Sequence, residues 1–194
     1  MPYKKSPLIA VALFLGLAAN ACAEEPAAST DALAADARGI SVKFAEKLKS
    51  ELVGAMKVDG PLKAIEVCNV AAPAIAADAS ANGWSVGRTS LKTRNPKNAP
   101  DVWEKRVLDE FDAAKSKGAD ATKLERFEVV EKNGVRTFRY MKAIPAAEPC
   151  LTCHGGSIKE PVKAKLAELY PDDRATGYKE GDIRGAFTLL KPLQ

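Results

Sequence analysis

The chain has 194 residues, of which 46% are hydrophobic and 28% are charged, and its formal net charge is +4. A chain of this length can bury about 70% of its unfolded surface, so it suits one compact domain. The small net charge argues against a nucleic-acid partner, because binding to phosphates relies on a concentrated positive field.

Residues 1–23 have the parts of a secretory leader. Lys4 and Lys5 precede an apolar stretch, and Ala-Cys-Ala ends the segment. The apolar stretch is too short to cross a bilayer, which takes about 20 residues. We therefore expect cleavage after residue 23, a tether over residues 24–30 and one domain over residues 31–194. Cleavage would lower the formal charge from +4 to +2, because it removes both lysines.

This leader predicts a soluble periplasmic product. The alternative is a lipoprotein that is anchored through Cys22. We expect this form less, because Ala19 stands where a lipoprotein signal carries a large aliphatic residue. Contact with a membrane is therefore expected only if Cys22 is lipidated.

Apolar residues recur every three or four positions from Asp31 to Met56, which predicts a long amphipathic helix at the N-terminus of the domain. Asp59-Gly60-Pro61 should end this helix, and proline suits the first turn of a second one. The second helix should extend to Asn82-Gly83. It carries Cys68 on its apolar face.

The rest of the chain predicts a mixture of strands and helices. The strands are expected over residues 84–90, 127–131, 135–144 and from Ile183 onward, and the helices over residues 101–118 and 161–169. Asp101 followed by Glu104 is a capping box, and Asn133-Gly134 between two strands predicts a hairpin. The order of elements is typical of an α+β domain in which helices flank an antiparallel sheet.

Cys150-Leu151-Thr152-Cys153-His154 follows the hairpin. C-x-x-C-H is the attachment motif of c-type haem: both thiols bond to one porphyrin, and the adjoining histidine becomes a ligand of the iron. We therefore predict one covalent haem c on Cys150 and Cys153, with His154 as an axial ligand. Prolines before the motif and glycines after it predict that it lies in an irregular loop.

Other interpretations of the motif are less favoured. A zinc site needs four Cys or His ligands in clustered pairs, and the remaining candidate, Cys68, is far away in sequence. A thioredoxin-like C-x-x-C motif needs no following histidine. A disulfide between Cys150 and Cys153 would close a small, strained ring.

The second axial ligand must be a group other than histidine, because His154 is the only histidine in the chain. The candidates are Cys68, Met56, Met141, a lysine, or no protein group at all. Cys68 is the one cysteine of the mature chain outside the motif, and an unpaired thiol in an oxidising compartment needs an explanation. It is either a small buried hydrophobic residue or a thiolate ligand, and its position alone does not decide.

Four segments resemble one protein family: residues 64–68, residues 88–104, the C-x-x-C-H motif and residues 177–186. This is the family of single-haem c-type domains with a PAS-like fold, long catalogued as of unknown function. Its members occur alone in the periplasm and as extracytoplasmic sensor parts of histidine kinases. The resemblance implies a PAS-like antiparallel sheet with flanking helices, and a haem held by His154 and Cys68.

The expected function is the sensing of redox state or of a diatomic gas, relayed to a signalling protein in the periplasm. The alternative is a low-potential electron-transfer cytochrome with a periplasmic redox partner, since a thiolate ligand stabilises ferric iron. Arg88 and Arg94 lie in a basic segment and are expected to pair with the haem propionates. Peroxidase-like or other enzymatic activity is not expected, because no second histidine can act as a distal base.

Overall fold

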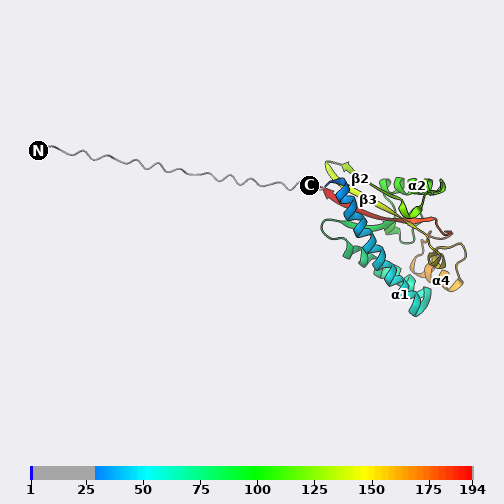
Figure 1. Cartoon of the computed structure of the whole chain (residues 1–194). Coiled ribbons are helices and arrows are strands. Elements are labelled where there is room, and N and C mark those ends of the chain that lie inside the picture. Colours follow the sequence, from blue (N-terminus) through cyan, green and yellow to red (C-terminus); the bar gives the residue numbers. More distant parts are fainter. Residues whose placement is uncertain (2–28, 194) are drawn as a thin grey trace.

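The computed structural model describes residue 1 and residues 29–193 (Figure 1). The predicted leader, Cys22 and nearly all of the predicted tether lie outside the described residues. The described helices and strands are α1 (Thr30–Ala79), β1 (Ser85–Thr89), α2 (Val102–Ser116), β2 (Glu125–Lys132), β3 (Val135–Pro145), α3 (Leu151–His154), α4 (Glu160–Leu169) and β4 (Ile183–Leu193). None of the helices within residues 29–193 is long and apolar enough to cross a membrane.

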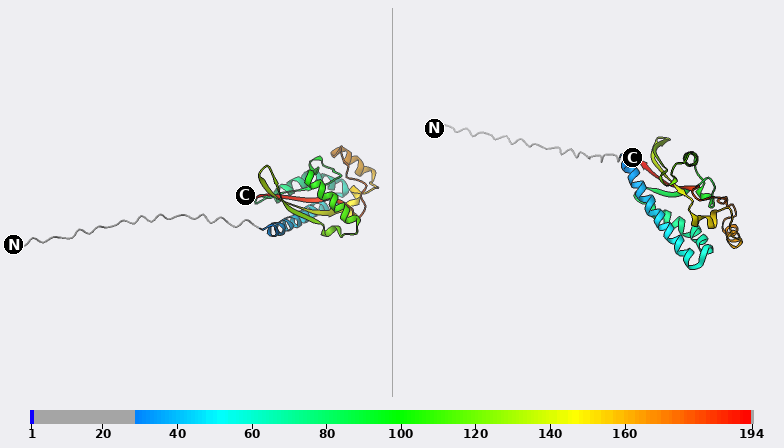
Figure 2. Two further views of the ribbon diagram at one scale, coloured as in Figure 1. Left: turned by 90° about the horizontal axis from the view of Figure 1, so that it is seen from above. Right: turned by 45° about the vertical axis from the view of Figure 1, so that its right-hand side comes forward.

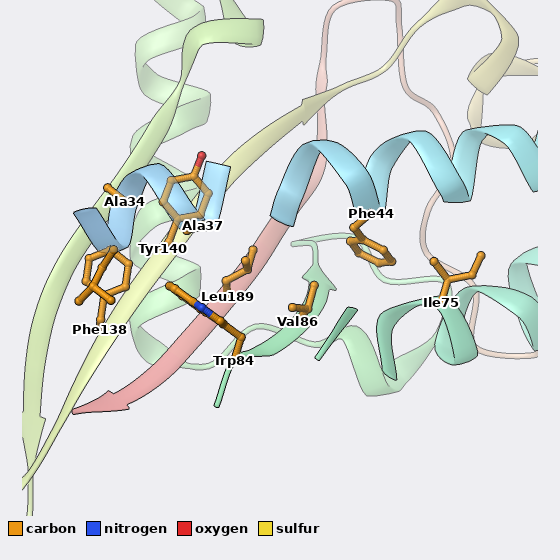
Figure 3. Packing of buried hydrophobic residues seen from close by; sticks show 10 residues of the cluster. Ala34, Ala37, Phe44, Ile75, Trp84, Val86, Phe138, Tyr140 and Leu189 are labelled. Carbon is orange, nitrogen blue, oxygen red and sulfur yellow. The ribbon is translucent and has the colours of Figure 1, made fainter. Parts of the chain in front are cut away.

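Helix α1 is two helical arms joined at Gly60, as the Asp59-Gly60-Pro61 sequence predicts. Gly60 has φ 72° and ψ −164°, a backbone conformation that glycine adopts without a steric penalty. The chain reverses direction there, and the second arm returns beside the first (Figures 1 and 2). Phe44 of the first arm and Ile75 of the second belong to one core cluster, so the two arms share a buried face (Figure 3).

The four strands form one antiparallel sheet in the order β1-β4-β3-β2. Asn133 and Gly134 both have positive φ, 53° and 77°, which is typical of the tight turn predicted between β2 and β3. Because neighbouring strands run in opposite directions, β1 ends, β4 begins and β3 ends at the same edge of the sheet. The segments that follow β1 and β3 and the segment that precedes β4 therefore meet there.

The sheet is covered on both faces. Helix α1 packs on one face, where the core contains Phe44, Trp84, Phe138, Tyr140 and Leu189 (Figure 3). Helix α2 covers a second cluster that contains Val107, Leu108, Phe111, Met141 and Ile183. The predicted α+β class, with an antiparallel sheet, flanking helices and a long N-terminal helix, is confirmed. Met141 is fully buried in the α2 cluster, as expected of a core residue.

The predicted irregular loop at the C-x-x-C-H motif is wrong. A 3-10 turn, Glu148–Cys150, leads directly into the helical turn α3, because Pro149 suits the start of a helical segment. In a helix, residues three and four positions apart lie on one face. Cys150, Cys153 and His154 have this spacing, so the turn presents all three side chains on the same side.

The capping box of α2 allows a test of the fold. Asp101 accepts a hydrogen bond from the Glu104 backbone at 2.8 Å and forms an ion pair with Arg139 at 2.7 Å. Burial raises the pKa of Asp101, but these hydrogen bonds outweigh it, so the pKa of the carboxyl is lowered in the folded state. A carboxyl of this kind stabilises the fold above its unfolded pKa of about 3.9, and the contribution is lost as the pH falls through the folded value.

We predict that Asp101→Ala lowers the free energy of unfolding by about 1 kcal/mol at neutral pH. Urea denaturation at pH 7 and in the acid range measures the effect, and the difference between variant and wild type should shrink in acid. Asp109→Ala is the matched control, because Asp109 forms only an exposed pair with Lys105 on the same helix. Its effect should stay below about 0.5 kcal/mol.

Candidate functional site

The predicted site residues come together at the sheet edge where β1 ends, β4 begins and β3 ends. Cys68 comes from the second arm of α1, Arg88 from β1, and the C-x-x-C-H motif from the turn that follows β3. Arg94 lies in the loop after β1. These groups lie close enough to affect one another's ionisation. The charges of Arg88 and Arg94 oppose the rise in the pKa of the Cys68 thiol, and Cys68 contributes to the raised pKa of Cys153. The structure thus gathers residues that lie up to 86 positions apart in the sequence.

The motif turn is held against the segment that precedes β4 by backbone hydrogen bonds. The Tyr178 N–H donates to the carbonyl of His154 at 3.0 Å, and the Gly177 N–H donates to the carbonyl of Gly155 at 3.0 Å. On its other side Cys153 packs against a small apolar cluster that includes Ile65 of α1 and Val162 of α4. The motif is therefore fixed between two parts of the chain.

His154 has a defined tautomer. Its Nδ1 lies 2.7 Å from the carbonyl oxygen of Ala175, so Nδ1 carries the proton and donates it. Nε2 is left with the lone pair that a metal ion would use. Burial, together with the charges of Arg184 and Arg94, lowers the pKa of His154 to about 2. The imidazole is therefore neutral and suited to bind a metal across the ordinary pH range.

Arg94 forms the most extensive set of contacts at the site. It pairs with Asp173 at 3.0 Å and donates to the carbonyl oxygens of Cys153 and Ala175, and its side chain is only 8% exposed. One Nη atom also lies 3.4 Å from Nε2 of His154. Arg94 thus cross-links the motif turn to the segment 173–175. Its predicted pairing with a propionate stays a prediction.

Arg88 and Arg184 are also mostly withdrawn from solvent, and burial lowers the pKa of both guanidinium groups. Among the described ion pairs, neither of them has a carboxylate partner, whereas Arg94 has Asp173. Sequence reasoning missed Arg184 as a site residue. The available signal was its position in the 177–186 segment, which was noted only as part of a resemblance. Asp173 and the carbonyl of Ala175 carried no signal in the sequence.

Burial raises the pKa of the Cys68 thiol, and Arg88, Arg94 and Arg184 oppose the shift. The alternative ligand Met141 lies in the core under α2, and Met56 lies in the first arm of α1. Cys68 is therefore the candidate sulfur whose surroundings include the motif residues. Within residues 29–193, no group of three or more His, Cys, Asp or Glu side chains is arranged to hold a metal ion by itself.

Two adjacent glycines after the motif allow a matched test of how tightly the motif turn packs. A Cβ on Gly155 would stand 2.6 Å from the carbonyl oxygen of Leu151, whereas a Cβ on Gly156 would meet nothing within 4 Å. We predict that Gly155→Ala lowers the free energy of unfolding by about 1–3 kcal/mol, because the backbone at position 155 must move away from the carbonyl of Leu151. Gly156→Ala should change it by less than about 0.5 kcal/mol. Equal effects of the two substitutions in urea denaturation would contradict the tight packing.

Comparisons with known proteins agree on one family. The family model described as Tll0287-like matches residues 19–192. A solved structure titled as the crystal structure of the cyanobacterial heme-protein Tll0287 is 26% identical in sequence and superposes with a TM-score of 0.60. The match covers 81% of this chain and 95% of that chain. No curated protein matches this chain.

Proposed function

The chain belongs to the Tll0287-like family, and on this premise we propose that it is a periplasmic protein that carries one covalent haem c. This membership confirms the family resemblance that the sequence motifs indicated. The solved relative is a haem protein, which supports haem as the cofactor. We propose Cys150 and Cys153 as the attachment residues, and His154 and Cys68 as the axial ligands.

The observation that carries this proposal is the arrangement of the motif turn. Two thiols and one imidazole have the three- and four-residue spacing of one helical face, and the neutral imidazole carries its lone pair on Nε2, where an iron would replace the 3.4 Å contact with Arg94. When bound, a haem supplies a one-electron redox centre at which a diatomic ligand can also bind. The chain contributes the thiols that anchor it, a histidine of fixed orientation and, from α1, the sulfur of Cys68 as the second axial donor.

The charges at the site also fit this cofactor. Arg88 is a cation without a carboxylate partner among the described ion pairs, and such a cation is costly to bury unless a counter-charge is supplied. A haem brings carboxylates. We propose that Arg88 pairs with one of them ahead of Arg94, because Asp173 and two backbone carbonyls already occupy the guanidinium of Arg94.

We propose that the protein senses redox state or a diatomic gas. Cys68 lies on the second arm of α1, which follows the break at Gly60 and packs against the first arm. Release of Cys68 from the iron would remove one attachment of that arm to the site, and a signalling partner could read the resulting shift. His154, in contrast, is held by hydrogen bonds to its ring and its backbone, so it is the fixed ligand.

The fixed surroundings of His154 also favour a second function, low-potential electron transfer. A centre whose ligands stay in place reorganises little when the iron changes oxidation state, which suits outer-sphere transfer. The thiolate of Cys68 would stabilise ferric iron and lower the reduction potential. Both functions share the same ligands and differ in whether Cys68 stays bound after reduction.

The direct test is expression of the full precursor in a host that can mature c-type cytochromes. We predict that the processed protein has the mass of residues 24–194 plus one haem, and that Cys150→Ala together with Cys153→Ala abolishes the added mass. We further predict that Cys68→Ala removes the low-spin ferric signal in electron paramagnetic resonance. Met141→Leu is the matched control, because Met141 is a core sulfur on the α2 side. Its signal should remain unchanged.

A bare polypeptide mass for the wild type would contradict the haem proposal. An unchanged signal in Cys68→Ala would contradict Cys68 as a ligand. Carbon monoxide separates the two functions: rapid binding after reduction indicates that Cys68 is released and supports sensing. If the reduced protein does not bind carbon monoxide, electron transfer is the function that remains.

A further inference from the structure

Arg184 owes its position to an irregularity in the sheet. Ile144 of β3 pairs with Gly185, and the next residue, Pro145, pairs with Ile183, so Arg184 is an extra residue without a partner in β3. Bulges of this kind turn a side chain out of the regular alternation of a strand. A Cβ at position 185 would collide with the backbone of β1, so glycine is required for the close approach at this point.

The bulge directs the guanidinium of Arg184 to His154. Its Nε lies 3.2 Å from Nδ1 of His154, and an Nη atom donates to the hydroxyl of Ser90 at 3.1 Å. The guanidinium carbon lies 5.4 Å from the ring centroid of Tyr178, and Tyr178 itself packs edge-on against His154. Ser90 and Tyr178 therefore hold the cation in place beside the imidazole.

The contact between Arg184 and His154 is electrostatic rather than a hydrogen bond. Nδ1 of His154 already donates its proton to the carbonyl of Ala175, so the Arg184 N–H faces another N–H. The contact places a positive charge next to the ring and takes no proton from it. Screening by solvent is weak there, because the guanidinium is mostly buried.

Arg94 is the second arginine beside His154, and it differs from Arg184 in its ion pairing. Asp173 pairs with it at 3.0 Å and offsets its charge. Arg184 has no such partner among the described ion pairs. Of the two arginines that contact the imidazole, Arg184 is thus the one without a directly paired carboxylate among the described ion pairs, and Asp173 acts on it only from a longer distance.

We propose that Arg184 is a positioning residue whose charge raises the reduction potential of the centre bound by His154. Reduction adds one electron to the iron, so a fixed cation next to its imidazole ligand stabilises the reduced state relative to the oxidised one. This effect offsets part of the lowering expected from the Cys68 thiolate. The inference rests on the proposed function, because it presumes that His154 is an iron ligand.

The test is a spectroelectrochemical titration of the mature haem-loaded protein. In Arg184→Gln the ratio of reduced to oxidised protein at a fixed applied potential should fall by roughly three- to tenfold. Arg184→Lys keeps the charge and should stay within about twofold of the wild type. Arg174→Gln is the matched control, because Arg174 is exposed and adjoins the same segment; it should also stay within about twofold.

An unchanged or higher ratio in Arg184→Gln would overturn the inference. So would a fall in Arg184→Lys as large as that in Arg184→Gln, because shape rather than charge would then be responsible. If Arg184→Gln takes up no haem, the titration is repeated with Arg184→Met, which keeps an apolar side chain over Tyr178. The fold-change expected for Arg184→Gln then applies to this variant. If both fail while Arg184→Lys is loaded, Arg184 serves assembly and the inference is wrong. A wild-type protein without haem would instead contradict the proposed function.

Discussion

The hydrogen bond from Nδ1 of His154 to the carbonyl oxygen of Ala175, 2.7 Å long, fixes the one histidine of the chain in a single tautomer and orientation. With Nδ1 occupied, only Nε2 can bind a metal, and burial keeps the ring neutral. The backbone hydrogen bonds of Gly177 and Tyr178 hold the same turn. The segment before β4 is therefore as necessary to the site as the C-x-x-C-H motif, although it supplies no metal ligand itself.

The sheet explains why these segments meet. Its order, β1-β4-β3-β2, places the end of β1, the start of β4 and the end of β3 at one edge. The second arm of α1 reaches the same edge because the chain reverses at Gly60. One imidazole, three thiols and three arginines then share a small region, and within residues 29–193 the pair of Arg94 with Asp173 is the one ion pair that joins a carboxylate to these arginines. Such a region favours a cofactor that carries negative groups of its own.

Local signals were sufficient to predict most of the fold. Gly60, the Asp101–Glu104 capping box and Asn133-Gly134 each act within a few residues, so the breaks and turns they predict are present. The helical turn at Cys150 was missed because prolines and glycines around it suggested a loop. The partners of the site could not be predicted. Asp173 is 79 positions from Arg94, and Arg184 reaches His154 only because a bulge in β4 redirects it.

X-ray absorption at the iron edge of the mature oxidised protein tests the central claim most directly, because it counts the sulfur and nitrogen atoms bound to the iron. The account predicts one sulfur and five nitrogens, four from the porphyrin and one from His154, with the sulfur contributed by Cys68 and absent when that residue is replaced by alanine. A protein that contains no iron, or an iron bound by nitrogen alone in the wild type, would contradict it.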